Sequence, residues 1–308
     1  SYYNILSGVL RGLGDSLSAL VFLLISTALN VILDIIFVAK LNMGVPGVAL
    51  ATVIAQAISA VLCLLKLLKM KENFDVNLKM LKLHKDYTLR LIKLGLPSGI
   101  TQGIFSLAMI IVQSLTNTFG ELVIASNVII MRVDGFAMMP NFSFGSAMTT
   151  YTGQNIGARK MDRVEEGTKQ GTMIAVGVST VITILILIFG KYLVGIFTDT
   201  RELIDFSTRM MRVLAVGYVA MAVTQSLGGV MRGAGDTVTP MWISLITTVL
   251  LRVPVAYGIA YFTRSENYPT GRPESVFISL LVAWTMGAII TTLFFRRGKW
   301  REKALIED

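Results

Sequence analysis

The sequence contains one cysteine and one histidine in 308 residues. A single cysteine, Cys63, excludes an internal disulfide framework, and because it lies in an apolar run we interpret it as a packing residue. A single histidine, His84, excludes a histidine-based metal centre and a Ser-His-Asp triad. Charge is scarce too, at 15% of residues against 54% hydrophobic residues. That balance excludes a soluble domain or a disordered chain and indicates a polytopic membrane protein.

The formal net charge is +9. In an apolar chain, a basic excess indicates loops that face anionic membrane lipids rather than a nucleic-acid partner. Loops on one side of the predicted spans carry 19 Lys and Arg residues and loops on the other side carry five. The positive-inside rule therefore predicts an inner (cytoplasmic) membrane protein with its C-terminus in the cytoplasm.

Eight apolar runs are long enough to cross a bilayer, which takes about 20 residues. They lie near residues 16–39, 46–69, 91–115, 121–145, 168–190, 206–231, 239–262 and 275–295. Pro97 and Pro240 are expected to open spans, and Pro140 and Pro254 to kink them as candidate hinges. The segment YTGQNIGARKMDR is expected to be a positively charged cytoplasmic turn.

The longest connection has the Leu, Met and Lys spacing of an amphipathic helix that lies on a membrane surface. The predicted organisation is an N-terminal lobe over residues 1–69, this linker over 70–90, a C-terminal lobe over 91–295 and a basic tail over 296–308.

An internal repeat links the two lobes. The segment LSGVLRGLGDSLS (Leu6 to Ser18) returns as LGGVMRGAGDTVT (Leu227 to Thr239), at an offset of 221 residues. Each copy precedes an apolar span, so we expect the same helix-turn-helix in two homologous halves. Two six-helix halves require a chain of about 440 residues with twelve spans, as in many secondary transporters. We therefore expect this chain to be a fragment whose parent has about 130 residues before Ser1.

Several segments carry a family resemblance: VLRGLGDS, NVILDIIFV, GVPGVALATVIAQ, KLGLPSGITQG, YTGQNIGARKMDR and GGVMRGAGDT. In order and spacing they resemble the multidrug and toxic compound extrusion (MATE) family, in the branch similar to DNA-damage-inducible protein F. The resemblance implies an all-α, two-lobe, pseudo-symmetric transporter with eight of its twelve helices in this chain. It implies a monomeric antiporter, not an enzyme, that uses no cofactor and expels small organic compounds, often cationic, by alternating access with Na⁺ or H⁺ as coupling ion.

Asp34 is the first candidate site residue, because a carboxylate inside a span needs a partner, a cation or a proton. Asn30 lies one helical turn earlier, and counting residues from the membrane surface places Thr52 of the next span at a similar depth. Three such oxygens suit a hard cation. The group is similar to the family's N-lobe cation site, which an Asp on the absent first helix completes. In the alternative, Asp34 only caps or braces its helix.

The third and fourth spans carry polar and methionine residues along one face each. Such faces would suit varied substrates in a central cavity, with Asp134 favouring cations; the alternative is interhelical hydrogen bonding and ordinary packing. Arg132 lies two residues before Asp134. Positions two apart do not face each other on a helix, so a neighbouring helix could supply the partner of either side chain. The candidate cavity residues are Gln102, Ser106, Met109, Gln113, Asn127, Met131, Asp134, Met138 and Asn141.

Two rival functions remain to be weighed. The strings Gly12 to Asp15 and Gly233 to Asp236 match the Gly-x-Gly-Asp of intramembrane aspartyl proteases, but that chemistry needs two carboxylates in one site, and these lie in separate turns. A lipid-linked oligosaccharide flippase of the same superfamily is the nearer alternative. It would be expected to line its cavity with several cationic residues, for which Arg132 and Arg252 are the mid-span candidates.

Overall fold

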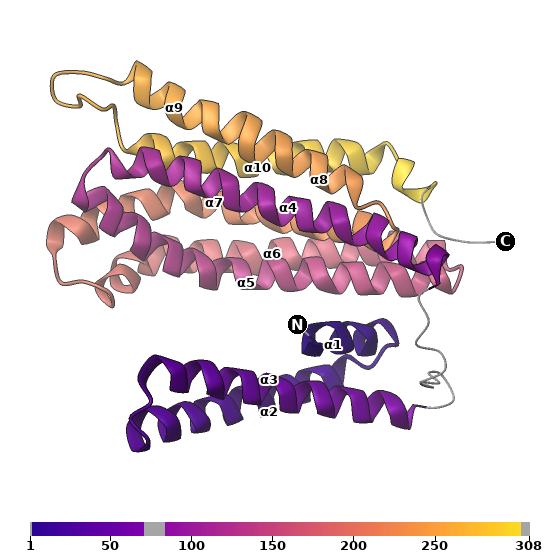
Figure 1. Cartoon of the computed structure of the whole chain (residues 1–308). Coiled ribbons are helices and arrows are strands. Elements are labelled where there is room, and N and C mark those ends of the chain that lie inside the picture. The colour runs from indigo at the N-terminus through magenta and orange to yellow at the C-terminus, as the bar shows by residue number, and fades with distance from the viewer. Residues whose placement is uncertain (1, 71–83, 303–308) are drawn as a thin grey trace. The chain divides into compact units, whose positions relative to one another are not determined.

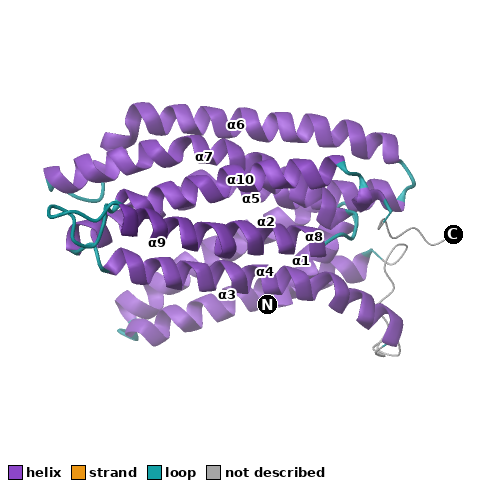
Figure 2. Cartoon of the chain, turned by 90° about the horizontal axis from the view of Figure 1, so that it is seen from above, coloured by secondary structure: helices purple, strands orange, loops and turns teal. Residues whose placement is uncertain are grey.

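The computed structural model describes residues 2–70 and 84–302. In these ranges the chain is helical, with helices joined by loops and no strand beyond one isolated bridge (Figure 2). Eight helical segments there are long and apolar enough to span a membrane, so the eight predicted spans are confirmed. They are Ser16–Lys40, Gly44–Lys69, Lys85–Asn117, Glu121–Gly157, Met161–Gly195, Arg201–Gly233, Val238–Phe262 and Glu274–Arg296.

The chain divides into two compact units, Ser1–Lys85 and Asp86–Asp308. The first contains α1 (Tyr2–Gly12), α2 (Ser16–Asp34), the π-helical segment η1 (Ile35–Lys40) and α3 (Gly44–Lys69). Its helices pack through a stripe of mostly small residues at every fourth position of α3, which lets backbones approach closely. That stripe is Gly47, Ala51, Ala55, Ser59, Cys63 and Leu67, so Cys63 is the packing residue that the sequence indicates.

The second unit contains the longer helices, which run alongside one another in Figure 1. The elements of this unit are α4 (Lys85–Asn117), α5 (Glu121–Gly157), α6 (Met161–Gly195), α7 (Arg201–Gly233), α8 (Val238–Ser244), the π-helical η3 (Leu245–Leu251), α9 (Arg252–Phe262), α10 (Glu274–Arg296) and the short η4 (Lys299–Arg301), of which α4 to α7 are the longest. The most buried span is α7, which packs against α5, α6 and α10. Tyr218, Leu214 and Met211 of α7 are fully buried in its main apolar core.

Helices α5 and α7 approach each other closely in this unit. A Cβ atom on Gly229 would lie 2.3 Å from the carbonyl oxygen of Gly145, and one on Gly233 would lie 2.4 Å from that of Thr149. The hydroxyl of Thr149 also donates a hydrogen bond to the Gly229 carbonyl, at 3.1 Å. Glycines four residues apart therefore let the two backbones meet, in the manner of small-residue motifs in membrane helices.

The two copies of the repeat fold alike. Gly14 and Gly235 have positive φ angles of 94° and 90°, which glycine adopts without strain. The following residue in each copy, Asp15 or Asp236, donates its backbone N–H to the carbonyl five residues earlier, at 2.9 Å in both. The predicted common helix-turn-helix is confirmed.

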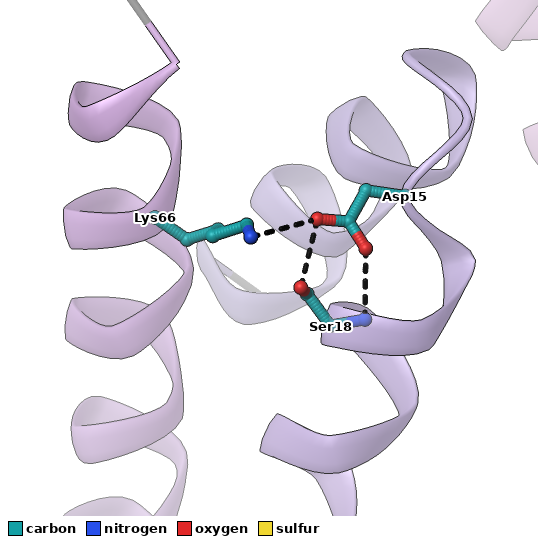
Figure 3. Close-up of polar contacts among 3 residues, drawn as sticks. All are labelled: Asp15, Ser18 and Lys66. Atoms are coloured by element: carbon teal, nitrogen blue, oxygen red, sulfur yellow. Dashed lines mark hydrogen bonds and ion pairs between the residues drawn. The ribbon is translucent and has the colours of Figure 1, made fainter.

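The carboxylate of Asp15 caps α2. It accepts hydrogen bonds from the backbone N–H of Ser18 at 2.9 Å and from the Ser18 hydroxyl at 2.7 Å, and Lys66 lies 3.3 Å away (Figure 3). The backbone N–H of Ser18 contributes most to lowering the pKa of Asp15 below its ordinary value, followed by the Ser18 hydroxyl and Lys66. In the second copy, Asp236 accepts from the N–H of Thr239 at 3.1 Å. Asp15 is thus the N-cap of α2, and Asp236, one residue before the N-cap Thr237, makes the corresponding bond to the first turn of α8.

Three local predictions need correction or limitation. Helix α4 begins at Lys85, so Pro97 lies inside the helix rather than at its start, and the carbonyl of Lys93 loses its helical partner. The hydroxyl of Thr237 donates to that carbonyl at 3.4 Å. The predicted turn YTGQNIGARKMDR is largely helical, since α5 continues to Gly157 and α6 begins at Met161. The predicted linker helix over 70–90 falls mostly on 71–83, outside the described residues.

Candidate functional site

The second unit contains a cavity of about 670 Å³. Residues of α4, α5, α7, α10 and the α8–η3–α9 span line it. Among them are eight of the nine predicted cavity residues: Gln102, Ser106, Met109, Gln113, Asn127, Met131, Asp134 and Met138. The polar faces that helical periodicity predicts on α4 and α5 therefore line the same cavity.

Asn141 is the exception, because its side chain points away from the cavity. It is fully buried, it accepts a hydrogen bond from the Ser179 hydroxyl at 2.6 Å, and its amide nitrogen donates to the Tyr218 carbonyl at 3.1 Å. Its amide therefore links α5 to α6 and α7. For Asn141, the structure supports the alternative of interhelical hydrogen bonding.

Two cavity residues also bond to each other across helices. The amide of Asn127 on α5 donates to the side-chain oxygen of Gln113 on α4 at 3.1 Å, and Gln113 donates to Asn117 at 2.9 Å. Facing the cavity and tying helices together are thus compatible roles for the same side chains.

Three ionisable side chains with a formal charge line the cavity: Asp134, Arg232 and Arg252. The hydroxyl of Tyr218 donates a hydrogen bond to the carboxylate of Asp134. Arg252 opens α9 directly after η3, and its Nε atom is buried without a hydrogen-bond partner among the described residues. The sequence left open whether a neighbouring helix pairs with Asp134 or with Arg132: Asp134 is bonded to Tyr218 of α7, and Arg132 is exposed over the ring of Phe197, 5.9 Å from its centroid.

Arg232 is a charged cavity residue that the sequence analysis did not predict to line the cavity. It belongs to the second repeat, which we interpreted only as a turn, yet α7 continues to Gly233 and carries the guanidinium into the cavity lining. Trp284 on α10 and Met221 on α7 also line the cavity and were not predicted. Both are apolar or aromatic residues, so the polar pattern used for α4 and α5 gave no signal for them.

The predicted cation site lies within the first unit, where the structure brings two of its residues into contact. The amide nitrogen of Asn30 donates to the hydroxyl oxygen of Thr52 at 3.3 Å, and Thr52 donates to the Val48 carbonyl at 3.0 Å. Asp34 lies one turn beyond Asn30, where α2 passes into η1. Its Oδ1 atom is buried with no hydrogen-bond partner in the described part of the chain, and its side chain makes no capping bond to η1.

Fold and cavity together define a multi-pass helical membrane protein of the transporter class. The family model described as MatE matches residues 97–258, more than half of the chain, so the chain belongs to this family. Its members are transporters, which excludes the aspartyl protease.

Curated relatives agree with this assignment. The chain is 27% identical to a probable multidrug resistance protein, YpnP, of Bacillus subtilis, over 99% of the chain and 66% of the relative. It is 25% identical to the probable multidrug resistance protein NorM of Thermotoga maritima, over 99% of the chain and 65% of the relative. The chain thus spans slightly less than two thirds of the length of these relatives.

Solved structures share the fold. A crystal structure of MATE in the bent conformation superposes with a TM-score of 0.88 at 23% identity, over 99% of this chain and 67% of that one. An outward-facing conformation of a multidrug resistance MATE family transporter gives 0.86, over 97% and 66%.

Proposed function

We propose that this protein exports small organic compounds across the cell membrane by alternating access, coupled to inward movement of Na⁺ or H⁺. The cavity in the second unit, with its mixture of amide, hydroxyl and methionine groups, is the observation that carries the proposal. Adaptable surfaces of this kind suit varied small molecules. The names of the curated relatives agree with multidrug export. The distribution of Lys and Arg supports a cytoplasmic C-terminus.

The coupling ion is proposed to bind at Asp34. A carboxylate within a membrane span costs about 2.5–3.5 kcal/mol on insertion scales, so an unpartnered Oδ1 implies a cation or a proton as partner. Asn30 uses its amide nitrogen on Thr52, which leaves its oxygen for a cation. Thr52 directs its hydroxyl proton at Val48, which leaves a lone pair. These oxygens fit a hard cation such as Na⁺, and the carboxylate alone fits H⁺.

Coupling of ion movement to export requires that the ion bind the two conformational states with different affinities. An ion that binds the outward-facing state more tightly than the inward-facing state shifts the protein toward the outward-facing one, and substrate release there completes export. An ion with equal affinity for both states would drive nothing.

The test is dye movement in proteoliposomes that contain the protein expressed from its complete gene. Ethidium and carboxyfluorescein, one cationic and one anionic dye, are followed under imposed Na⁺ or H⁺ gradients. We compare wild type with Asp34→Asn and with Asp199→Asn, which removes an exposed carboxylate from the α6–α7 loop. Transport under one gradient, lost in Asp34→Asn and kept in Asp199→Asn, supports the proposal and identifies the ion. Normal transport by Asp34→Asn would refute coupling at this residue.

One observation favours a second candidate function. Arg232 and Arg252 give the cavity two cationic side chains, as a lipid-linked oligosaccharide flippase would need for a pyrophosphate. If wild type moves neither dye under either gradient, the flippase becomes the leading function. The expectation of cationic substrates depends on Asp134 alone, and the two arginines oppose it.

A further inference from the structure

The charges of the cavity do not balance. The lining contains one carboxylate, Asp134, and two guanidinium groups, Arg232 and Arg252, so the described lining carries a formal charge of +1 at neutral pH. Excess charge of one sign in a cavity with apolar walls attracts ligands of the opposite sign. The location of the excess charge then decides where an acidic group of a ligand would lie.

Asp134 and Arg252 lie beside the main apolar core, which involves their sequence neighbours Val133 and Val253, whereas Met231, the neighbour of Arg232, belongs to a separate apolar cluster. Tyr218 belongs to the same main core and donates to Asp134. Arg232 is 14 residues further along α7 than Tyr218, which is about 21 Å at 1.5 Å per residue. Asp134 is therefore too distant to compensate Arg232, and the unbalanced charge lies at the end of the cavity where α7 stops.

The guanidinium of Arg232 lies over two glycines. A Cβ on Gly228 would be 3.3 Å from its Nη1, and a Cβ on Gly145 would be 3.4 Å from its Nη2. Within the described part of the chain, no hydrogen bond or ion pair engages this guanidinium. Its planar set of donors is thus held against backbone on one side and lines the cavity.

The internal repeat supplies the contrast. In the first copy, Arg11 occupies the position of Arg232 and donates to the hydroxyl of Ser7, four residues earlier, at 3.5 Å. The residue that corresponds to Ser7 in the second copy is Gly228. The second copy thus keeps the arginine and removes the side chain that could accept its hydrogen bond.

We propose that the cavity binds organic anions, with Arg232 as the counter-charge for a carboxylate, sulfonate or phosphate group. Apolar residues beside it, including Met231 and Ile243, would contact the ligand's apolar body. The inference depends on the proposed function, because it specifies the substrate class of the same cavity. An acidic lipid headgroup shares this chemistry with a soluble anion, so the test separates the two sources.

The test uses two probes with the same ring system and opposite charge, naphthalene-2-sulfonate and 2-naphthyltrimethylammonium. Their affinities are measured by titration calorimetry with the complete protein in phosphatidylcholine nanodiscs. The variants are Arg232→Gln, Arg232→Lys and Gly228→Ser, the last of which restores the acceptor that Arg11 has. Arg212→Gln is the matched control, because it removes an exposed charge from the same helix outside the cavity.

Wild type is expected to bind the sulfonate more tightly than the ammonium compound. Arg232→Gln should weaken sulfonate binding by about 10- to 100-fold, the range for a charge-assisted hydrogen bond, and should leave the ammonium compound unaffected. Arg232→Lys and Gly228→Ser should give smaller losses in the same direction, and Arg212→Gln should give none. Phosphatidylglycerol in the nanodiscs should weaken sulfonate binding only while Arg232 is present, if a lipid headgroup competes for the site.

Equal affinity of wild type for the two probes would overturn the inference. An Arg232→Gln variant that loses affinity equally for both probes would also overturn it. Absence of binding by either probe would overturn it as well. The proposed export function is judged separately by the dye measurement, so anion selectivity can fail while gradient-driven transport stands.

Discussion

The contact between α5 and α7 gives a sharp stability prediction. A methyl group added by Gly229→Ala would lie 2.3 Å from the Gly145 carbonyl oxygen, whereas ordinary contacts begin at 3.4 Å. The helices would have to separate by about 1 Å, and the obstacle is backbone, which no rotamer change can move. Overpacking of this kind costs about 1–3 kcal/mol, and a rigid obstacle favours the upper end.

The adjacent glycine is the matched control. A Cβ on Gly228 meets only the end of the flexible Arg232 side chain, at 3.3 Å. Gly228→Ala should therefore be neutral or stabilise by up to about 1 kcal/mol, because alanine is the better helix former. At about 3 kcal/mol and roughly 2–4 °C per kcal/mol for a unit of this size, Gly229→Ala should lower the unfolding temperature by about 6–12 °C relative to a neutral Gly228→Ala. Thermal unfolding in one detergent measures both, and equal unfolding temperatures would refute the close contact.

Two further predictions concern the repeat turns. The pKa of Asp15 is lowered chiefly by the backbone N–H of Ser18, so its charged form stabilises the folded protein at neutral pH, and this contribution is lost as the pH falls below about 4 and through the folded-state pKa. Asp15→Asn, which keeps the cap, should reduce the loss of unfolding temperature between pH 7 and pH 3, and an unchanged pH profile would count against the prediction. Thr237→Val removes the donor to the Lys93 carbonyl and should cost about 0.6 kcal/mol, with Thr237→Ser close to wild type in the same unfolding assay; identical values for both variants would show that the long hydrogen bond contributes nothing.

Some features of the site could be predicted because they depend on one helix at a time. Helical periodicity places residues three and four apart on one face, so the polar stripes of α4 and α5 identified eight cavity residues. The same reasoning failed for Asn141. Its position on the stripe is correct, but Ser179 and the Tyr218 backbone, both on other helices, hold its amide away from the cavity.

The Asp134 environment shows the same limit. Nothing in the spacing of the sequence relates Asp134 to Tyr218, which is 84 residues away and donates to its carboxylate. Arg132, the near neighbour in sequence, lies on a different side of α5 and stacks over Phe197. Sequence proximity on a helix does not bring side chains together when they are two positions apart.

The number of spans, the repeat and the polar faces of α4 and α5 can be predicted from the sequence, because hydrophobicity, length and periodicity are local properties of a segment. Which helix faces meet depends on tertiary packing. It brought Arg232 of the repeat into the cavity, turned Asn141 toward α6 and α7, and gave the carbonyl freed by Pro97 a hydroxyl from a segment 144 residues away. Those outcomes depend on how closely helix backbones approach one another, which glycines such as Gly229 permit but do not specify.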